Sequence, residues 1–133
     1  MAASVELVNL YRQLLEDVSS GNRAGMNALL AEDPGVNLVG TAPDEFIQGR
    51  EEIISVVSDA TARGFRLVPG LPLGYESGDT GWVVDRSHFS LNGLEVADRM
   101  TAVFTRTQDG WRLVHLHHSV GIPDDKLGIL SNS

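Results

Sequence analysis

The sequence predicts an α+β fold in which a strongly curved antiparallel sheet wraps, cone-like, around three N-terminal helices. Apolar residues recur at helical spacing in the first half of the chain and alternate at strand spacing in the second half. A run of helices followed by a run of strands is typical of this class. Because three helices cannot cover both faces of four long strands, we expect the outer face of the sheet to be shared with a second copy, as a homodimer.

The helices are predicted from apolar residues at i, i+3 and i+4. Residues 4–20 form the first helix, and a shorter second helix covers about 22–31 before the Asp33-Pro34-Gly35 turn. The third helix runs roughly over 50–62 and ends at Gly64.

The strands are separated by turn signals. A short strand over 36–41 precedes a brief turn that holds Phe46 and Ile47. The segment 65–76 contains prolines and a glycine, which indicate an edge position or a bulge. Asn92-Gly93 and Asp109-Gly110 are hairpin signals, so the remaining long strands are expected over 81–91, 94–107 and from 111 onward.

Composition excludes several function classes. Residues 1–133 are about one domain's worth, and we find no linker or repeat. The chain has no cysteine, which removes disulfides, thiolate metal sites and cysteine nucleophiles. Its formal net charge of -8 would repel a phosphate backbone, so we expect no nucleic-acid partner. No apolar run is long enough for a membrane span and no signal pattern opens the chain, so we expect no membrane partner and a cytoplasmic location.

The last strand concentrates the histidines. Simple alternation places Trp111, Leu113, His115, His117 and Ser119 on one face, and His118 on the other. Near-neutral histidines can transfer protons, so His117 is a candidate catalytic residue. Histidines two residues apart on a strand can also bind a metal, but a third ligand would have to come from a neighbouring strand. We predict no metal site and no cofactor.

The motif Asp-Gly-Trp-Arg-Leu-Val-His-Leu-His-His-Ser (109–119) resembles the terminal strand of SnoaL-like domains in the nuclear transport factor two-like superfamily. It is similar also to the association domain of calcium/calmodulin-dependent kinase II, whose last strand reads Trp-x-Ile-Val-His-Phe-His-Arg-Ser. The segment 44–51 resembles the entry into the third helix of SnoaL-like domains, and the element order agrees along nearly the whole chain. At His118 the sequence departs from the kinase domain, where an arginine lines the pocket.

The resemblance implies a cystatin-like roll with a pocket between helices and sheet, commonly dimeric through the outer face of the sheet. It does not imply one activity, because the superfamily includes ketosteroid isomerase, polyketide cyclases, epoxide hydrolases, transport factors and assembly domains.

Asp85 is the leading candidate for a general base. On one parity it shares a strand face with apolar neighbours, and burial would raise the pKa of its carboxyl. Tyr11, on the inner stripe of the first helix, is a candidate donor to an enolate oxygen. The competing interpretation is that Asp85 pairs with Arg86, Arg99 or another arginine at the sheet surface.

Two function hypotheses follow. The first is a cofactor-free isomerase, cyclase or dehydratase that acts on a hydrophobic carbonyl compound by acid/base chemistry, with Asp85 or His117 transferring the proton. The second is a non-catalytic ligand-sensing or oligomerisation module. Contacts to the small molecule are assigned to a set of polar and aromatic side chains: Tyr11, Trp82, His88, Arg99, His115 and His118.

Overall fold

The computed structural model describes residues 1–128. Helices and strands follow the predicted order, with short additional strands. Their bounds are β1 Ala2–Ala3, α1 Val5–Ser20, α2 Arg23–Leu29, β2 Asn37–Val39, β3 Phe46–Gln48, α3 Arg50–Ala62, β4 Arg66–Val68, β5 Leu73–Ser77, β6 Thr80–Leu91, β7 Leu94–Thr107, β8 Gly110–Ser119 and α4 Asp124–Leu127.

The first helix begins and ends where its sequence indicates. The Ser4 hydroxyl accepts a hydrogen bond from the Leu7 amide at 3.2 Å, which caps the N-terminus. Gly21 closes the helix with φ 70°, a left-handed conformation that suits glycine. The buried stripe of α1 packs into the hollow of the sheet, which builds the hydrophobic core from both layers.

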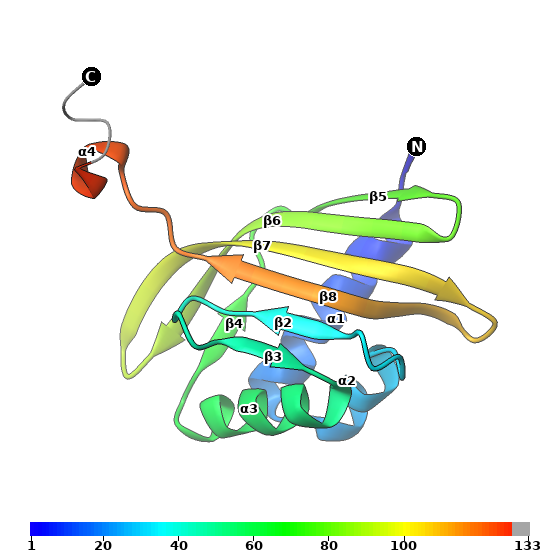
Figure 1. The fold of residues 1–133 in the computed structure, drawn as a ribbon, viewed down its shortest axis with the longest axis horizontal. Helices are drawn as coiled ribbons and strands as arrows, with labels where there is room; N and C mark the ends of the chain where they lie inside the picture. The colour runs from blue at the N-terminus through cyan, green and yellow to red at the C-terminus, as the bar shows by residue number, and fades with distance from the viewer. Residues whose placement is uncertain (129–133) are drawn as a thin grey trace.

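One curved sheet holds all the strands of residues 1–128, in the order β1-β5-β6-β7-β8-β2-β3, with β4 also paired to β6. Figure 1 shows the long β6–β7–β8 strands bending over the helices, with α3 below the hollow side. All ladders are antiparallel except that of β2 with β8, which is parallel. The sheet is therefore mixed, although the sequence predicted antiparallel pairing throughout.

The predicted strand over 65–76 is two strands. β4 pairs with the far end of β6, and β5 pairs with its near end. The proline- and glycine-containing segment 69–72 lies between them because it cannot continue the ladder. Phe46 and Ile47, predicted as a turn, belong to the short strand β3.

A β-bulge in β8 decides which side chains reach the interior. Phe104 pairs with Leu113 but its neighbour Val103 pairs with His115, so Val114 is an extra residue. An extra residue turns the following side chains to the opposite face. Burial agrees, because Leu113 and Leu116 are buried whereas His115 is only half-buried.

Candidate functional site

A pocket of about 230 Å³ lies between α3 and the hollow side of the sheet. Its walls come from α1, α3 and the curved strands, and the loop between β2 and β3 lies at one end. Most of its lining is apolar, and it contains Val18, Leu38, Val56, Val57, Ala60, Phe65, Leu67, Phe89, Leu91, Met100 and Leu116. The pocket can therefore hold a compact hydrophobic molecule.

Three polar side chains also line this pocket: His118, Thr41 and Glu45. Thr41 and Glu45 belong to the β2–β3 loop, where Glu45 Oε1 accepts a hydrogen bond from the Ala42 amide at 3.3 Å. His118 lies on β8, beyond the bulge, and only 8% of its surface is exposed. The imidazole is thus the one titratable group held within the body of the sheet that also contacts this pocket.

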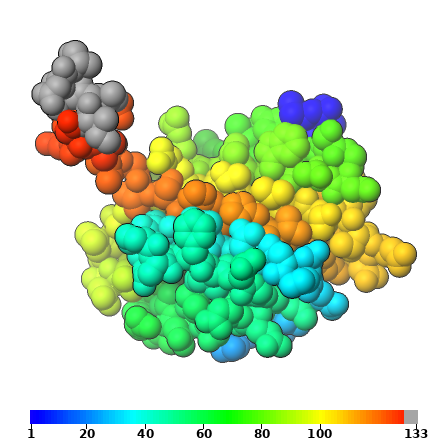
Figure 2. Space-filling model, in the orientation of Figure 1, coloured from blue at the N-terminus to red at the C-terminus, as the bar shows by residue number. Residues whose placement is uncertain are grey.

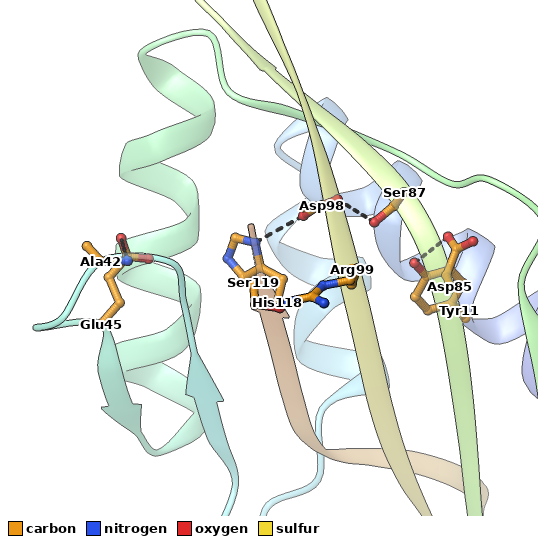
Figure 3. A network of polar contacts seen from close by, with 9 residues as sticks. All are labelled: Tyr11, Ala42, Glu45, Asp85, Ser87, Asp98, Arg99, His118 and Ser119. Atoms are coloured by element: carbon orange, nitrogen blue, oxygen red, sulfur yellow. Dashed lines mark hydrogen bonds and ion pairs between the residues drawn. The ribbon is translucent and has the colours of Figure 1, made fainter. Parts of the chain in front are cut away.

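His118 is held from behind by a buried carboxylate. Its Nδ1 lies 3.2 Å from Asp98 Oδ2 on β7, and Asp98 Oδ1 accepts a hydrogen bond from the Ser87 hydroxyl at 2.5 Å (Figure 3). A carboxylate only accepts, so the ring donates from Nδ1, and in the neutral ring this leaves the lone pair on Nε2. Asp98 is 3% exposed, and Ser87 and His118 together satisfy both of its oxygens.

Asp85 faces inward, as the alternation of β6 predicted, but it does not line the pocket. Its Oδ2 accepts a hydrogen bond from the Tyr11 hydroxyl at 2.7 Å (Figure 3). The same oxygen accepts a second hydrogen bond from the Gly70 amide at 3.0 Å. Neither Arg86 nor Arg99 pairs with it within the described chain. Tyr11 and Asp85 form a buried pair that ties α1 to the sheet.

The polar residues on β6 and β7 together set the pKa of Tyr11. Burial raises the pKa of the Tyr11 phenol far above its usual value, and the hydrogen bond to Asp85 and the charge of that residue raise it further. The Ser87 hydroxyl acts in the opposite direction on the pKa of Tyr11, and the charge of Asp98 adds to the rise. Tyr11 therefore stays a neutral donor.

His117, the other candidate for proton transfer, does not line the inner pocket. The bulge at Val114 places His115 and His117 on the outer face of the sheet, where His117 is exposed. The two rings do share a face, as predicted, with centroids 6.1 Å apart. His115 Nδ1 also contacts Asn37 Oδ1 on β2.

Partial burial lowers the pKa of His115, and the nearby charge of His117 lowers it further. The neutral form of His115 is thus favoured. Nothing on this face encloses a small molecule around the histidines, since the hollow lined by His115 is an open depression over β2 and β3.

Three other predicted contact residues also lie outside the inner pocket. Trp82 is half-buried on the outer face beside Tyr75, with ring centroids 6.1 Å apart. His88 is exposed on the same face of β6. Arg99 is exposed and donates a hydrogen bond to Ser119 Oγ at 3.1 Å. Alternation along β6 and β7 sends all three outward, so the predicted set splits between two faces of one sheet.

Sequence reasoning missed Asp98 and Ser87 as members of the site. The signal was the register of the β6–β7 hairpin, in which Ser87 lies directly opposite Asp98. Both side chains point to the buried face of the sheet. Ser87 shares this face with Asp85 on β6, and Asp98 shares it with Met100 on β7.

No cluster of three or more potential metal ligands occurs within residues 1–128. The histidine pair on β8 lacks a third ligand from a neighbouring strand, because the outward residues opposite it on β7 are Thr101 and Val103. The predicted absence of a cofactor stays a prediction.

A curved sheet over helices, with a pocket in its hollow, is the fold of nuclear transport factor two-like structures. The family model of the SnoaL-like domain matches residues 7–123. The chain therefore belongs to the SnoaL-like domain family. A comparison with curated proteins finds no match.

Solved structures share this fold. A candidate dehydratase of the nuclear transport factor two-like family from Streptomyces avermitilis matches with a TM-score of 0.78 at 19% identity, over 89% of this chain and 95% of the other. A candidate calcium/calmodulin-dependent kinase II association domain from Xanthomonas campestris matches with a TM-score of 0.73 at 22% identity, over 90% and 87%. A candidate ketosteroid isomerase from Shewanella frigidimarina matches with a TM-score of 0.67 at 19% identity, over 84% and 92%.

At these identities the likeness concerns the fold.

No helix among residues 1–128 is both long and apolar enough to cross a membrane.

Proposed function

We propose that this SnoaL-like protein is a cofactor-independent acid/base enzyme that moves a proton on a compact hydrophobic carbonyl compound. His118 is the proton-transfer group and Asp98 is its positioning residue. One observation carries the proposal: an imidazole backed by a buried carboxylate lies at the wall of an apolar pocket.

The geometry suits abstraction of a proton from a carbon next to the carbonyl. His118 Nε2 accepts the proton, and the electron pair of the broken C–H bond forms an enolate. The charge of Asp98 stabilises the resulting imidazolium, and Ser87 fixes the other oxygen of Asp98. The imidazolium then returns the proton, either to another carbon in an isomerisation or to a departing hydroxyl in a dehydration.

Few neutral side chains near the pocket can donate a hydrogen bond to an enolate oxygen. Thr41 is the one hydroxyl that lines it, and Tyr11 is occupied by Asp85. We therefore assign the contact with the enolate oxygen to Thr41 in place of Tyr11.

The volume of the pocket restricts the substrate. About 230 Å³ is below the ~300–1,000 Å³ typical of sites for drug-sized ligands. The substrate is consequently smaller than a steroid, and a short-chain or single-ring ketone fits the space better.

The test is enzyme-dependent hydrogen–deuterium exchange in D₂O, followed by NMR on a panel of short-chain and single-ring enones and β-hydroxy ketones. We expect wild-type protein to exchange the proton next to the carbonyl of at least one compound. His118→Gln should lower that rate by ~10²–10⁴-fold, the usual contribution of a positioned acid/base group.

His117→Gln is the matched control, because it makes the same change at the adjacent residue, on the outer face, and should leave the rate unchanged. If both variants exchange as fast as wild type, or if both lose the activity equally, His118 is not the proton-transfer group.

The second candidate is a non-catalytic ligand-sensing module. The apolar pocket favours it, since binding requires only the cavity and not the dyad of His118 and Asp98. Saturable binding of the same panel without any exchange, unaffected by His118→Gln, would support this candidate.

A further inference from the structure

The outer face of the sheet carries a groove that the inner-pocket chemistry does not use. It is open, has a volume of about 630 Å³ and lies over the segment before β5 and over β5, β6 and β7. Leu71, Leu73 and Val84 give it an apolar strip, with 88%, 56% and 38% of their surfaces exposed. Arg86 and Arg99 line the same groove.

The two arginines face one another without a carboxylate between them. They are directly opposite in the β6–β7 register, where like charges destabilise a sheet. Within residues 1–128 neither forms an ion pair, and Arg99 only donates to the Ser119 hydroxyl. Asp85 also borders the groove, but its side chain turns to the inner face, where Oδ2 accepts a hydrogen bond from Tyr11. The groove thus presents two cations beside an apolar strip.

The C-terminal arm, residues 120–128, presents the complementary chemistry. It leaves β8 immediately beside Arg99, and then stands away from the body (Figures 1 and 2). Asp124 and Asp125 open its short helix α4, and Ile122 and Leu127 are 58% and 49% exposed. The family match ends at residue 123, just before α4.

We propose that the arm of one copy docks in the outer-face groove of a second copy, and that the arm of the second copy docks in the groove of the first. The acidic pair lies against Arg86 and Arg99, and the apolar residues of the arm cover the strip of Leu71, Leu73 and Val84. The contact brings two anions to two opposed cations and buries exposed apolar surface on both sides.

The occupant is a second copy for two reasons. First, both halves of the contact occur on one chain, so a two-fold pair makes the contact twice. Second, the four residues between β8 and α4, 120–123, can span up to ~13 Å, which exceeds the ~10 Å between two packed sheets. An arm that stands away from its own body is already placed for such an exchange. This inference does not depend on the chemistry of the inner pocket.

A charge-reversal exchange tests it on the full chain. The first variant reverses the groove, with Arg86→Glu and Arg99→Glu, and the second reverses the arm, with Asp124→Arg and Asp125→Arg. By sedimentation, wild type should be a dimer, and each variant alone should dissociate with a dissociation constant at least ~10-fold higher, because like charges now meet.

Mixing is the decisive measurement. In a pair of the two variants, the reversed arm meets the reversed groove at one contact and the wild-type arm meets the wild-type groove at the other. An equimolar mixture should therefore form a heterodimer with wild-type affinity. If the mixture stays monomeric, the arm docks on its own chain or elsewhere, and the proposal is wrong. It is equally wrong if wild type is a monomer at all concentrations, or if each variant alone dimerises like wild type.

The matched control is Glu16→Arg with Asp59→Arg, which makes the same charge change on exposed helix positions across the sheet and should leave the dimer intact. Circular dichroism checks that each variant folds. Should the groove reversal fail to fold, Arg86→Gln with Arg99→Gln replaces it, and a wild-type dissociation constant for that variant would overturn the proposal.

Discussion

Two buried carboxylates on neighbouring strands have different partners, and the partners decide their roles. Asp85 is held by the Tyr11 hydroxyl and the Gly70 amide, away from the inner pocket. Asp98 is held by Ser87 and orients His118, which does line that pocket. Burying a charge requires such compensation, so each group is fixed in place. We infer that the first pair supports the fold and the second supports proton transfer.

Tyr11→Phe separates these roles. The change removes one of the two donors to a buried carboxylate, and we expect the free energy of unfolding in urea to fall by ~1–3 kcal/mol. Proton exchange by the folded variant should stay at the wild-type rate. Tyr75→Phe, at a half-buried position on the outer side, is the control and should change stability by less than ~0.5 kcal/mol. Loss of exchange in Tyr11→Phe at unchanged stability would return Tyr11 to the catalytic machinery.

At the scale of single elements, alternation predicted β6 correctly and β8 only in part. Burial alternates without interruption from Gly81 to Ser87, so the sequence could predict which residues share a face with Asp85. That this face looks inward is known from the structure. In β8 the extra residue Val114 reverses the alternation, so that His118 faces inward and His117 outward. No local sequence signal marks this bulge, because valine and histidine are ordinary strand residues and the register depends on the partner strand β7.

The outward histidine pair gives a pH-dependent prediction. His117→Gln removes one of the two causes that lower the pKa of His115, so the pKa of His115 should rise while staying below its usual value because burial remains. Titration of the His115 ring by NMR measures this shift. A pKa of His115 that is the same in wild type and variant would show that the rings do not interact in solution.

The same lowered pKa has a consequence for stability. Because folding disfavours protonation of His115, the stability that its neutral form contributes is present above the unfolded-state pKa and is lost as the pH falls through the histidine range.

At the scale of the whole molecule, helical and strand periodicity were sufficient to predict an α+β cone over residues 1–133. They could not predict the volume of the pocket, which depends on how side chains from α1, α3 and the curved strands pack together. The short strands at both edges of the sheet, β1 and β3, were not predicted, because strands of two or three residues are too short to show a periodic pattern. The homodimer and the cytoplasmic location stay predictions.

Filling the pocket tests whether it is the binding site. Ala60→Phe adds a phenyl ring to the α3 wall, and binding of a fluorescent hydrophobic probe such as Nile red should weaken at least ~10-fold. Ala62→Phe, an exposed position on the same helix, should bind like wild type. Equal binding by both variants would place the probe site elsewhere on the protein.

The tautomer of His118 tests the central claim most directly. In a long-range ¹H–¹⁵N NMR spectrum of protein with labelled histidine, neutral His118 should carry its hydrogen on Nδ1, because Asp98 can only accept. Asp98→Asn should move that hydrogen to Nε2, since the amide then donates to Nδ1 and blocks the basic lone pair facing the pocket. A wild-type ring with its hydrogen on Nε2, or a tautomer that does not respond to Asp98→Asn, would contradict the account.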